Sequence, residues 1–245
     1  MKKSIVLLIL SVFVLAGCAK KDIVMEQTEV TLHHGETYQI SAESHNPITY
    51  LSEDRYHAEV NSDGVVTGVC VGETYIKLSN GNDEKKLHVI VTPTNFCMTE
   101  PDIAFGDSKS SVLAKLGEPD MEEAEDGLTA LLYLYTDYAT VMMILLDEND
   151  VVVATVLGGM TNIFEDMRVF LEERYLNVGA YTMEGYDGMA YINALTENEA
   201  TIKVVHTLVE NQLSLAIYST PEYINENDDF GLRVSPAKLF QMIRK

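Results

Sequence analysis

The sequence lacks tryptophan and is poor in cysteine and in basic residues. Its 245 residues include 3 Cys, and 17 Lys and Arg stand against 38 Asp and Glu, which gives a formal charge of −21. So acidic a chain repels phosphate backbones and anionic lipid headgroups at long range, which argues against sequence-independent nucleic-acid binding. The hydrophobic content of 47% argues against global disorder. At about 100–150 residues per domain, the length fits two or three small domains.

Sequence motifs of common enzyme classes are also missing. The chain contains no GxSxG, GxxxxGKS/T, HExxH or GxGxxG pattern. Nucleophile-elbow hydrolases, P-loop proteins, zincins and dinucleotide-binding domains therefore have no local support. We expect a protein that is not an enzyme, with no catalytic, cofactor-binding or metal-binding residues. An enzyme whose site is assembled from scattered acidic residues is the alternative.

Only one apolar run stands out, and it lies at the start of the chain. Residues Ile5 to Ala16 are apolar apart from one serine and follow Lys2 and Lys3. The run is too short to span a hydrocarbon core about 30 Å thick, which needs about 20 helical residues. This pattern predicts a signal peptide over residues 1–17.

The sequence Leu-Ala-Gly-Cys at 15–18 resembles a bacterial lipobox. The resemblance implies that the Cys18 thiol receives a diacylglyceryl group and that cleavage before Cys18 leaves residues 18–22 as a lipidated tether. We therefore expect an exported protein that is lipid-anchored to the bacterial cell membrane or outer membrane, facing the periplasm or the exterior. An ordinary secretory signal with an incidental cysteine is the alternative.

The two other cysteines, Cys70 and Cys97, are expected to be free, partly buried thiols. A disulfide between them stays open, because an exported protein could keep one. The chain has no CxxC motif and no Cys/His spacing that suits zinc.

Residues 23–93 carry the pattern of an all-β sandwich. Short segments that alternate apolar and polar residues are separated by turn residues at intervals of about 8–12 positions. Asp63-Gly64 and Asn80-Gly81 predict tight turns, because glycine accepts positive φ at no steric cost. Alternate residues of two segments are predicted to share a face: Tyr38, Ile40 and Ala42 in one, and Leu87, Val89 and Val91 in the other.

Four stretches of this region resemble the bacterial immunoglobulin-like domain, group 2. They read EVTLHHGETYQI, YLSED, AEVNSDGVVTGVCVGETYIKL and LHVIVTP, and SDGVVTGVCVGETYI is the most specific part. Tyr50 stands where the family often has a tryptophan. The resemblance implies an Ig-like domain that serves as a stalk, spacer or adhesive module on a bacterial surface, and not as a catalyst.

After a linker over residues 94–101, the pattern becomes helix followed by strands. In the region 102–160, SKSSVLAKL is predicted to be a helix that begins at Asp107 or Ser108 and stops at Gly117. An acidic loop follows, and then the three predicted strands LLYLY, TVMMILL and VVVATVL.

The region 161–224 repeats this order of elements. A helix is predicted over Ile163 to Leu176, followed by the strand MAYINAL and a hairpin in ATIKVVHTLVENQLSLAIYS, which aligns with ATVMMILLDENDVVVATV if one residue is inserted. A unit of ~60 residues buries little surface alone, so the two should pack together. We therefore expect an α+β region of two helix-plus-antiparallel-sheet repeats.

The first copy, with Leu116-Gly117-Glu118-Pro119 at the end of its helix, resembles the small-lipoprotein and β-lactamase-inhibitory-protein superfamily. The resemblance implies a helical segment packed on an antiparallel sheet. It also implies binding to other proteins, either to inhibit a hydrolase or to assist envelope assembly. The second copy departs from this motif, because it reads Leu176-Asn177-Val178-Gly179.

The predicted strands over 141–146 and 151–157 are apolar on both faces, whereas an antiparallel sheet with one wet face alternates. A helix covers one face, and the sister repeat, the C-terminal segment or a partner covers the other. In the C-terminal segment 225–245, Ser235-Pro236 predicts the start of a short helix with an apolar stripe. That stripe is Leu239, Phe240 and Ile243. We expect this helix to dock on the second half; a free basic tail that recruits a partner is the alternative.

Histidines and acidic residues are the remaining candidates for chemistry. His33 and His34 are adjacent on a predicted strand and point to opposite faces, which indicates surface residues and not metal ligands. His206 shares a strand face with Val204, which indicates a core or edge histidine and not a catalytic base. Residues 225–231 superficially resemble a calcium loop, but the glycine falls one place late. An acidic cluster is interpreted as a solvated loop, with calcium or a basic partner as its functional alternative: Glu118, Asp120, Glu122, Glu123, Glu125 and Asp126.

These observations predict a membrane-anchored, non-catalytic cell-envelope lipoprotein. Its only site residue is the lipidated Cys18, and its Ig-like domain spaces a binding or adhesion module from the membrane. That module would bury apolar strand surface and tyrosines against a protein or glycan partner. The alternative is an inhibitor or assembly accessory protein of the β-lactamase-inhibitory-protein type that acts on an envelope or extracellular enzyme.

Overall fold

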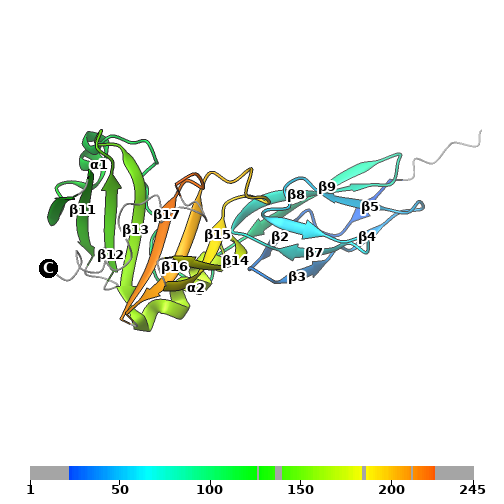
Figure 1. Ribbon diagram of the computed structural model, residues 1–245. Helices are drawn as coiled ribbons and strands as arrows, with labels where there is room; N and C mark the ends of the chain where they lie inside the picture. The colour runs from blue at the N-terminus through cyan, green and yellow to red at the C-terminus, as the bar shows by residue number, and fades with distance from the viewer. Residues whose placement is uncertain (1–21, 126, 136–139, 184–185, 211, 224–245) are drawn as a thin grey trace, which may run out of the picture.

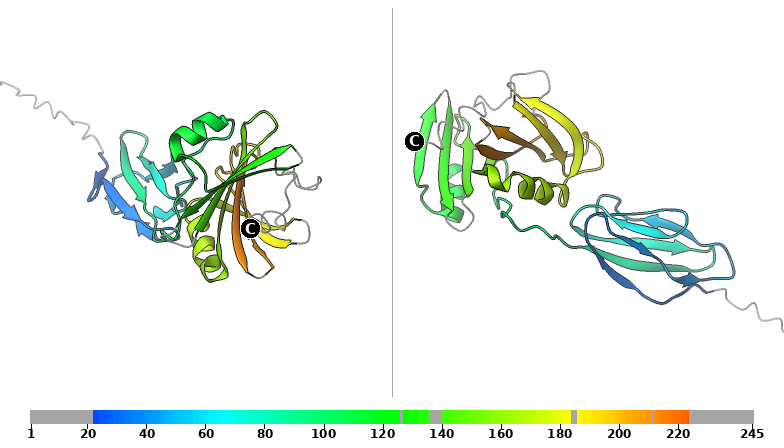
Figure 2. Two further views of the ribbon diagram at one scale, coloured as in Figure 1. Left: turned by 90° about the vertical axis from the view of Figure 1, so that its left-hand side faces the viewer. Right: turned by 90° about the horizontal axis from the view of Figure 1, so that it is seen from below.

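Two units lie end to end in the described part of the chain, a β sandwich and a larger sheet that carries two helices (Figure 1, Figure 2). The protein is mostly β, which is consistent with the predicted all-β sandwich. The computed structural model describes residues 22–125, 127–135, 140–183, 186–210 and 212–223. The predicted signal peptide 1–17, the lipid site Cys18 and the C-terminal segment 225–245 lie outside the described residues.

The N-terminal unit is an all-β sandwich, as predicted. A four-stranded sheet in the order β2-β9-β8-β5 faces a three-stranded sheet in the order β3-β7-β6, and β1 pairs with β4. The β2–β9 pair is parallel and the other described pairs of this unit are antiparallel. Its strands are β1 (Val24–Met25), β2 (Glu29–Leu32), β3 (Thr37–Gln39), β4 (Ala42–Glu43), β5 (Thr49–Ser52), β6 (Ala58–Val60), β7 (Val65–Gly68), β8 (Gly72–Ser79) and β9 (Glu84–Val91).

Alternating apolar side chains from both sheets make the core of the sandwich. Ile76 and Leu87 from one sheet and Val66 from the other are fully buried. Burying such a side chain contributes about 1.5–3 kcal/mol relative to leaving it exposed. The six residues predicted to share core faces all belong to this core or pack against it: Tyr38, Ile40, Ala42, Leu87, Val89 and Val91.

The predicted turn at Asp63-Gly64 is confirmed. Gly64 has φ 79°, and the side-chain Oδ1 of Asn61 accepts hydrogen bonds from the main-chain N–H groups of Asp63 and Val65, each at 3.0 Å. A Cβ atom at position 64 would lie 2.8 Å from the Cζ atom of Tyr50. Glycine therefore serves both the turn and the close approach of Tyr50, which packs against the sandwich core.

The C-terminal unit is one antiparallel sheet of eight strands in the order β10-β11-β12-β13-β17-β16-β15-β14. A helix precedes β10 and a second helix precedes β14, so each half of the sheet is a run of four consecutive strands behind its own helix. The halves meet where β13 pairs with β17. The elements are α1 (Lys109–Leu116), β10 (Met121–Glu125), β11 (Leu128–Tyr135), β12 (Thr140–Leu146), β13 (Val152–Met160), η1 (Thr161–Ile163), α2 (Phe164–Glu172), β14 (Leu176–Met183), β15 (Tyr186–Ile192), β16 (Lys203–Val209) and β17 (Leu213–Ser219).

Capping residues set the bounds of α1 as predicted. The Ser108 hydroxyl accepts a hydrogen bond from the Ser111 N–H, which otherwise has no partner in the first turn. At the other end Gly117 takes φ 82° and its N–H donates to the carbonyl oxygen of Leu113. The positive φ ends the helix, since glycine adopts it without strain.

The sequence prediction was wrong at both edge strands of the sheet. The acidic segment predicted as a loop contains β10, which pairs with β11; charged side chains suit an edge strand because they oppose pairing with other chains. The helix predicted to reach Leu176 ends at Glu172, and Leu176 begins β14. β-Branched Val178 and Thr182 favour the strand there. Segment 176–179, which stands where the first copy has its helix-end motif, is therefore strand.

Both faces of the sheet are buried, as predicted for the strands over 141–146 and 151–157. Val112 of α1 and Phe170 of α2 pack on one face, which we call the helix face. Neither described helix contributes to the core cluster of the opposite face, where Leu145 and Ile217 are fully buried and Tyr223 packs against them. Within the described residues, neither helix has the length and apolar character needed to cross a membrane.

Candidate functional site

The two halves of the sheet meet at a seam whose centre is polar. Thr155 of β13 and Tyr218 of β17 are cross-strand partners, and both point to the helix face. Their strands are otherwise almost wholly apolar on this face, with Leu157 and Ala216 as the next residues along. Two hydroxyl groups are therefore placed side by side in an apolar layer.

A cavity of about 450 Å³ lies over this seam. Segment 100–105, which leads from the linker to α1, forms one wall, and the ends of β16 and β17 form another. Its size falls within the range of about 300–1,000 Å³ that is typical of small-molecule sites. The residues that line it are Glu100, Pro101, Ile103, Ala104, Phe105, Thr155, Tyr175, Thr201, Ile202, Tyr218 and Thr220.

Two of the hydroxyl groups in this lining have no hydrogen-bond partner. Thr155 is 1% exposed and Tyr218 is 3% exposed, and neither Oγ1 of Thr155 nor the phenol oxygen of Tyr218 is bonded. An unsatisfied buried hydroxyl costs about 1–3 kcal/mol. Four buried side-chain atoms of the described residues lack a partner, with the Tyr191 hydroxyl and Nδ1 of His206 as the other two, and two of the four belong to residues that line this cavity.

The charged group of the cavity is Glu100. The hydroxyl of Tyr175 donates a hydrogen bond of 2.6 Å to Oε1 of Glu100, and the rings of Tyr175 and Tyr218 meet edge to face at 6.1 Å. Burial raises the pKa of both phenols, and the Glu100 carboxylate raises them further. Both phenols therefore stay protonated and are able to donate or accept hydrogen bonds.

His206 is buried elsewhere on the helix face. It is 1% exposed, its ring stacks on Phe164 at 4.4 Å, and its Nε2 lies 2.9 Å from the hydroxyl of Ser214. Burial lowers the pKa of His206 to about 4, so the ring is neutral at pH 7. The Ser214 hydroxyl is fully buried and bonds to the sulfur of Met167, which leaves this pair closed to a substrate. The structure therefore places His206 in the core.

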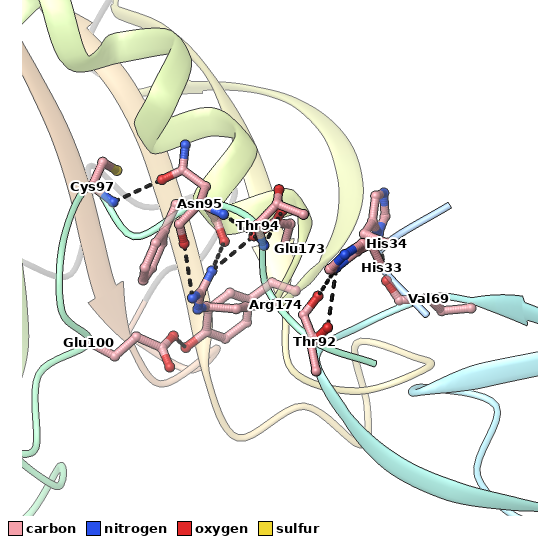
Figure 3. Close-up of polar contacts among 12 residues, drawn as sticks. His33, His34, Val69, Thr92, Thr94, Asn95, Cys97, Glu100, Glu173 and Arg174 are labelled. Carbon is pink, nitrogen blue, oxygen red and sulfur yellow. Dashed lines mark hydrogen bonds and ion pairs between the residues drawn. The ribbon is translucent and has the colours of Figure 1, made fainter. Parts of the chain in front are cut away.

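The other residues considered from the sequence do not assemble into a site. His33 and His34 each bond to a main-chain carbonyl oxygen, of Thr92 and Val69 respectively (Figure 3). In the acidic segment, Glu122 pairs with Lys109 of α1 at 2.7 Å. Among the described residues, no group of three His, Cys, Asp or Glu side chains could hold a metal ion.

Cys70 and Cys97 are free thiols in the structure. Burial raises the pKa of Cys70 to about 12 and that of Cys97 to about 11. Because the thiolate is the reactive form, both cysteines are poor nucleophiles at neutral pH.

The segment predicted as a linker is bound tightly to the sheet unit by Glu173 (Figure 3). The Glu173 carboxylate, 3% exposed, accepts hydrogen bonds from the N–H groups of Thr94 and Asn95 at 3.0 Å and from the Thr94 hydroxyl. The sandwich reaches the same corner, where the N–H of Val71 donates to the Glu173 carbonyl oxygen at 2.7 Å. The Tyr56 hydroxyl donates to the carbonyl oxygen of Arg174, also at 2.7 Å. These bonds join the sandwich, the linker and the end of α2 in one place, which we call the junction.

Sequence reasoning missed the cavity and the junction. Glu100, Thr155 and Tyr218 lie in three separate segments, and no short motif links them. The available signal was Thr155, a single hydroxyl within the apolar run VVVATVL, and Tyr218 in LSLAIYS. Glu173 follows a helix that is rich in acidic residues, so the sequence gives no sign that its carboxylate is buried and not solvated.

No family model and no curated protein matches the chain. Among solved structures, the chain is similar to an extracellular protein containing a SCP domain from Bacillus anthracis strain Ames, with 16% identity and a TM-score of 0.29. It is also similar to the S-layer protein SbsC, with 12% identity and a TM-score of 0.26, and to domains 5–6 of SbsC, with 14% identity and the same TM-score. The matches cover 62%, 77% and 80% of this chain. They span 59%, 25% and 95% of the three other chains, respectively.

Proposed function

We propose that the protein is an exported, membrane-anchored cell-envelope lipoprotein without catalytic activity, and that its C-terminal sheet is a binding module. The observation that carries the proposal is the cavity over the β13–β17 seam, where the buried hydroxyls of Thr155 and Tyr218 have no partner. Folding leaves two costly groups unpaired at one place, and a ligand or a partner's side chain would satisfy them.

The anchor in this proposal is lipid on Cys18, which the lipobox-like sequence at 15–18 supports. Cells that express the full chain and are fed a radiolabelled fatty acid should label it, and Cys18→Ser should remove the label. Cys97→Ser is the matched control and should keep it. Label that persists in Cys18→Ser would contradict lipidation at this residue.

The sandwich acts in this proposal as an Ig-like spacer, which its resemblance to the group 2 domain supports. The junction supports it too, because main-chain and side-chain bonds from Glu173, Val71 and Tyr56 hold the sandwich against the sheet unit. A module held at a fixed place on its stalk presents one surface outward, as a binding role requires.

A cavity-filling variant tests the binding role. Ala104 is exposed and lines the cavity, so Ala104→Trp should fill it without disturbing the core. Residues 19–245, immobilised and exposed to envelope extract, should retain a partner that Ala104→Trp loses. Ser110→Trp, on the exposed side of α1, should retain that partner. Equal capture by both variants would place binding elsewhere or refute it.

We also propose a second candidate, an inhibitor or assembly accessory of the β-lactamase-inhibitory-protein type built from two helix-plus-sheet repeats. The order of elements supports it, since α1 precedes β10–β13 and α2 precedes β14–β17. This candidate requires nanomolar inhibition of one secreted hydrolase in a panel that includes serine β-lactamases. Micromolar binding to glycans alone would count against it and favour an adhesion role.

A further inference from the structure

Building on the proposed binding role, we propose that the cavity over the β13–β17 seam binds a small organic ammonium ion with an apolar body. The charge of the lining, its aromatic walls and its unpaired hydroxyl groups each favour such a ligand.

The charge of the lining favours a cation. Glu100 is the acidic residue among the lining residues, and none of them is basic. Arg174 interacts electrostatically with Tyr218, but its guanidinium already bonds to the Phe170 and Asn95 carbonyl oxygens and lies 3.5 Å from Glu173. A ligand carboxylate in the cavity would lie near the negative charge of Glu100, and no basic residue of the lining would neutralise it. The chain's formal charge of −21 would repel it further.

The walls favour an ammonium ion over a metal ion. Phe105, Tyr175 and Tyr218 place aromatic rings around the cavity. Aromatic faces attract organic cations through their quadrupole. Ile103 and Ile202 add apolar surface that would pack against an alkyl or aryl body. A metal ion would instead need several oxygen, nitrogen or sulfur ligands, and Glu100 is the single carboxylate in this lining.

The open acceptors match the three N–H groups of a primary ammonium. Oε1 of Glu100 accepts from Tyr175, and Oε2 lies on the same carboxylate. The hydroxyl oxygens of Thr155 and Tyr218 have no partner. Both hydroxyl oxygens are covered by surrounding atoms, whereas Glu100 is the charged group of the lining. A ligand that brings three donors would bond to the carboxylate and, after a small shift of the lining, to the two hydroxyls as well, whereas a neutral alcohol brings one donor.

Calorimetric titration of residues 19–245, which include every described residue, tests the inference. The probes share one body: 2-phenylethylammonium, 2-phenylethanol and 3-phenylpropionate. We expect saturable 1:1 binding of the ammonium ion, at least about tenfold tighter than the alcohol, and no binding of the carboxylate. Glu100→Gln keeps the acceptor for Tyr175. It should weaken binding of the ammonium ion about tenfold or more and leave the affinity for the alcohol unchanged. Thr155→Val should weaken it several-fold, and Glu118→Gln, outside the lining, should change nothing.

Two results would overturn the inference. One is an equal affinity for the alcohol and the ammonium ion that Glu100→Gln leaves unchanged. The other is no binding of any probe, which means that the cavity holds water only. Partner capture that Ala104→Trp removes would then still support the proposed function, so the two failures are distinguishable. Ammonium binding without any captured partner would support this inference and count against a macromolecular partner.

Discussion

The hydroxyl of Thr155 is buried without a partner, and its effect on stability is measurable. Thr155→Val has nearly the same shape and removes the unsatisfied group, so the free energy of unfolding should rise by about 1 kcal/mol. Urea denaturation measures this. Thr207→Val is the matched control: Thr207 is equally buried, but its hydroxyl donates to the Asp187 carbonyl oxygen at 2.8 Å, so this variant should lose about 1 kcal/mol. A loss in Thr155→Val would mean that ordered water already satisfies the hydroxyl.

His206 gives a second prediction at the residue scale, for pH. Its folded pKa is about 4 because it is buried, whereas an unfolded histidine has a pKa of about 6.5. As pH falls from about 6.5 to about 4, the unfolded state takes up a proton that the folded state does not. The free energy of unfolding therefore falls, by about 3 kcal/mol at pH 4.

Comparing variants across this pH range isolates the effect. His206→Gln should lose most of the pH dependence between 6.5 and 4. His88 should behave in the opposite way, because its ring N–H groups donate to the carboxylates of Glu29 and Glu73, which raises its pKa, and its contribution is lost as pH rises. If His206→Gln keeps the slope of the natural chain, another group is responsible.

At the scale of strands, Gly188 allows β15 to pair closely with β16. A Cβ atom at position 188 would lie 2.4 Å from the carbonyl oxygen of His206, which is main chain and cannot rotate away. Gly188→Ala should therefore push the strands apart and lower the free energy of unfolding by about 2 kcal/mol. Hydrogen exchange should show faster exchange of the amides between β15 and β16. Unchanged stability and exchange would show that the pair tolerates a methyl group.

Local chemistry explains which elements were predictable. Ser108 and Gly117 predicted the ends of α1, and Asp63-Gly64 predicted the turn. Both were predictable because helix capping and positive φ depend on one or two neighbouring residues. β10 was missed because an edge strand carries charges as a loop does. The end of α2 was missed because no glycine or proline marks it between Glu172 and Val178. The cavity was missed because its polar groups meet only when β13 pairs with β17, and these strands are far apart in the sequence.

At the scale of the whole molecule, Glu173 controls the junction. Burial alone would raise the pKa of Glu173, but hydrogen bonds from Thr94 and Asn95 and the charge of Arg174 outweigh it and lower the pKa. The stability that this group provides is present above the unfolded pKa of about 4.3 and is lost as pH falls through the lower folded pKa. The junction should therefore loosen in acid below about pH 4.

A charge-removing variant should loosen the junction at neutral pH. Glu173→Ala leaves the N–H groups of Thr94 and Asn95 without their acceptor and should lower the free energy of unfolding by about 2 kcal/mol. Small-angle scattering should then show a wider distribution of end-to-end distances. Glu172→Ala, which loses only a more exposed pair with Arg168, should keep the scattering of the natural chain. Identical scattering from both variants would show that other contacts hold the units.

The stretch 94–105 is bound by Glu173 at its start and walls the cavity at its end. In an anchored protein, a pull on the sandwich would travel along this stretch toward segment 100–105. The hydrogen bonds that Thr94 and Asn95 donate to Glu173 hold the start of this stretch to the sheet unit. They would therefore bear the force before segment 100–105 does. If the chain is anchored as proposed, a pull on the sandwich would therefore deform the cavity wall only after the hydrogen bonds to Glu173 had broken.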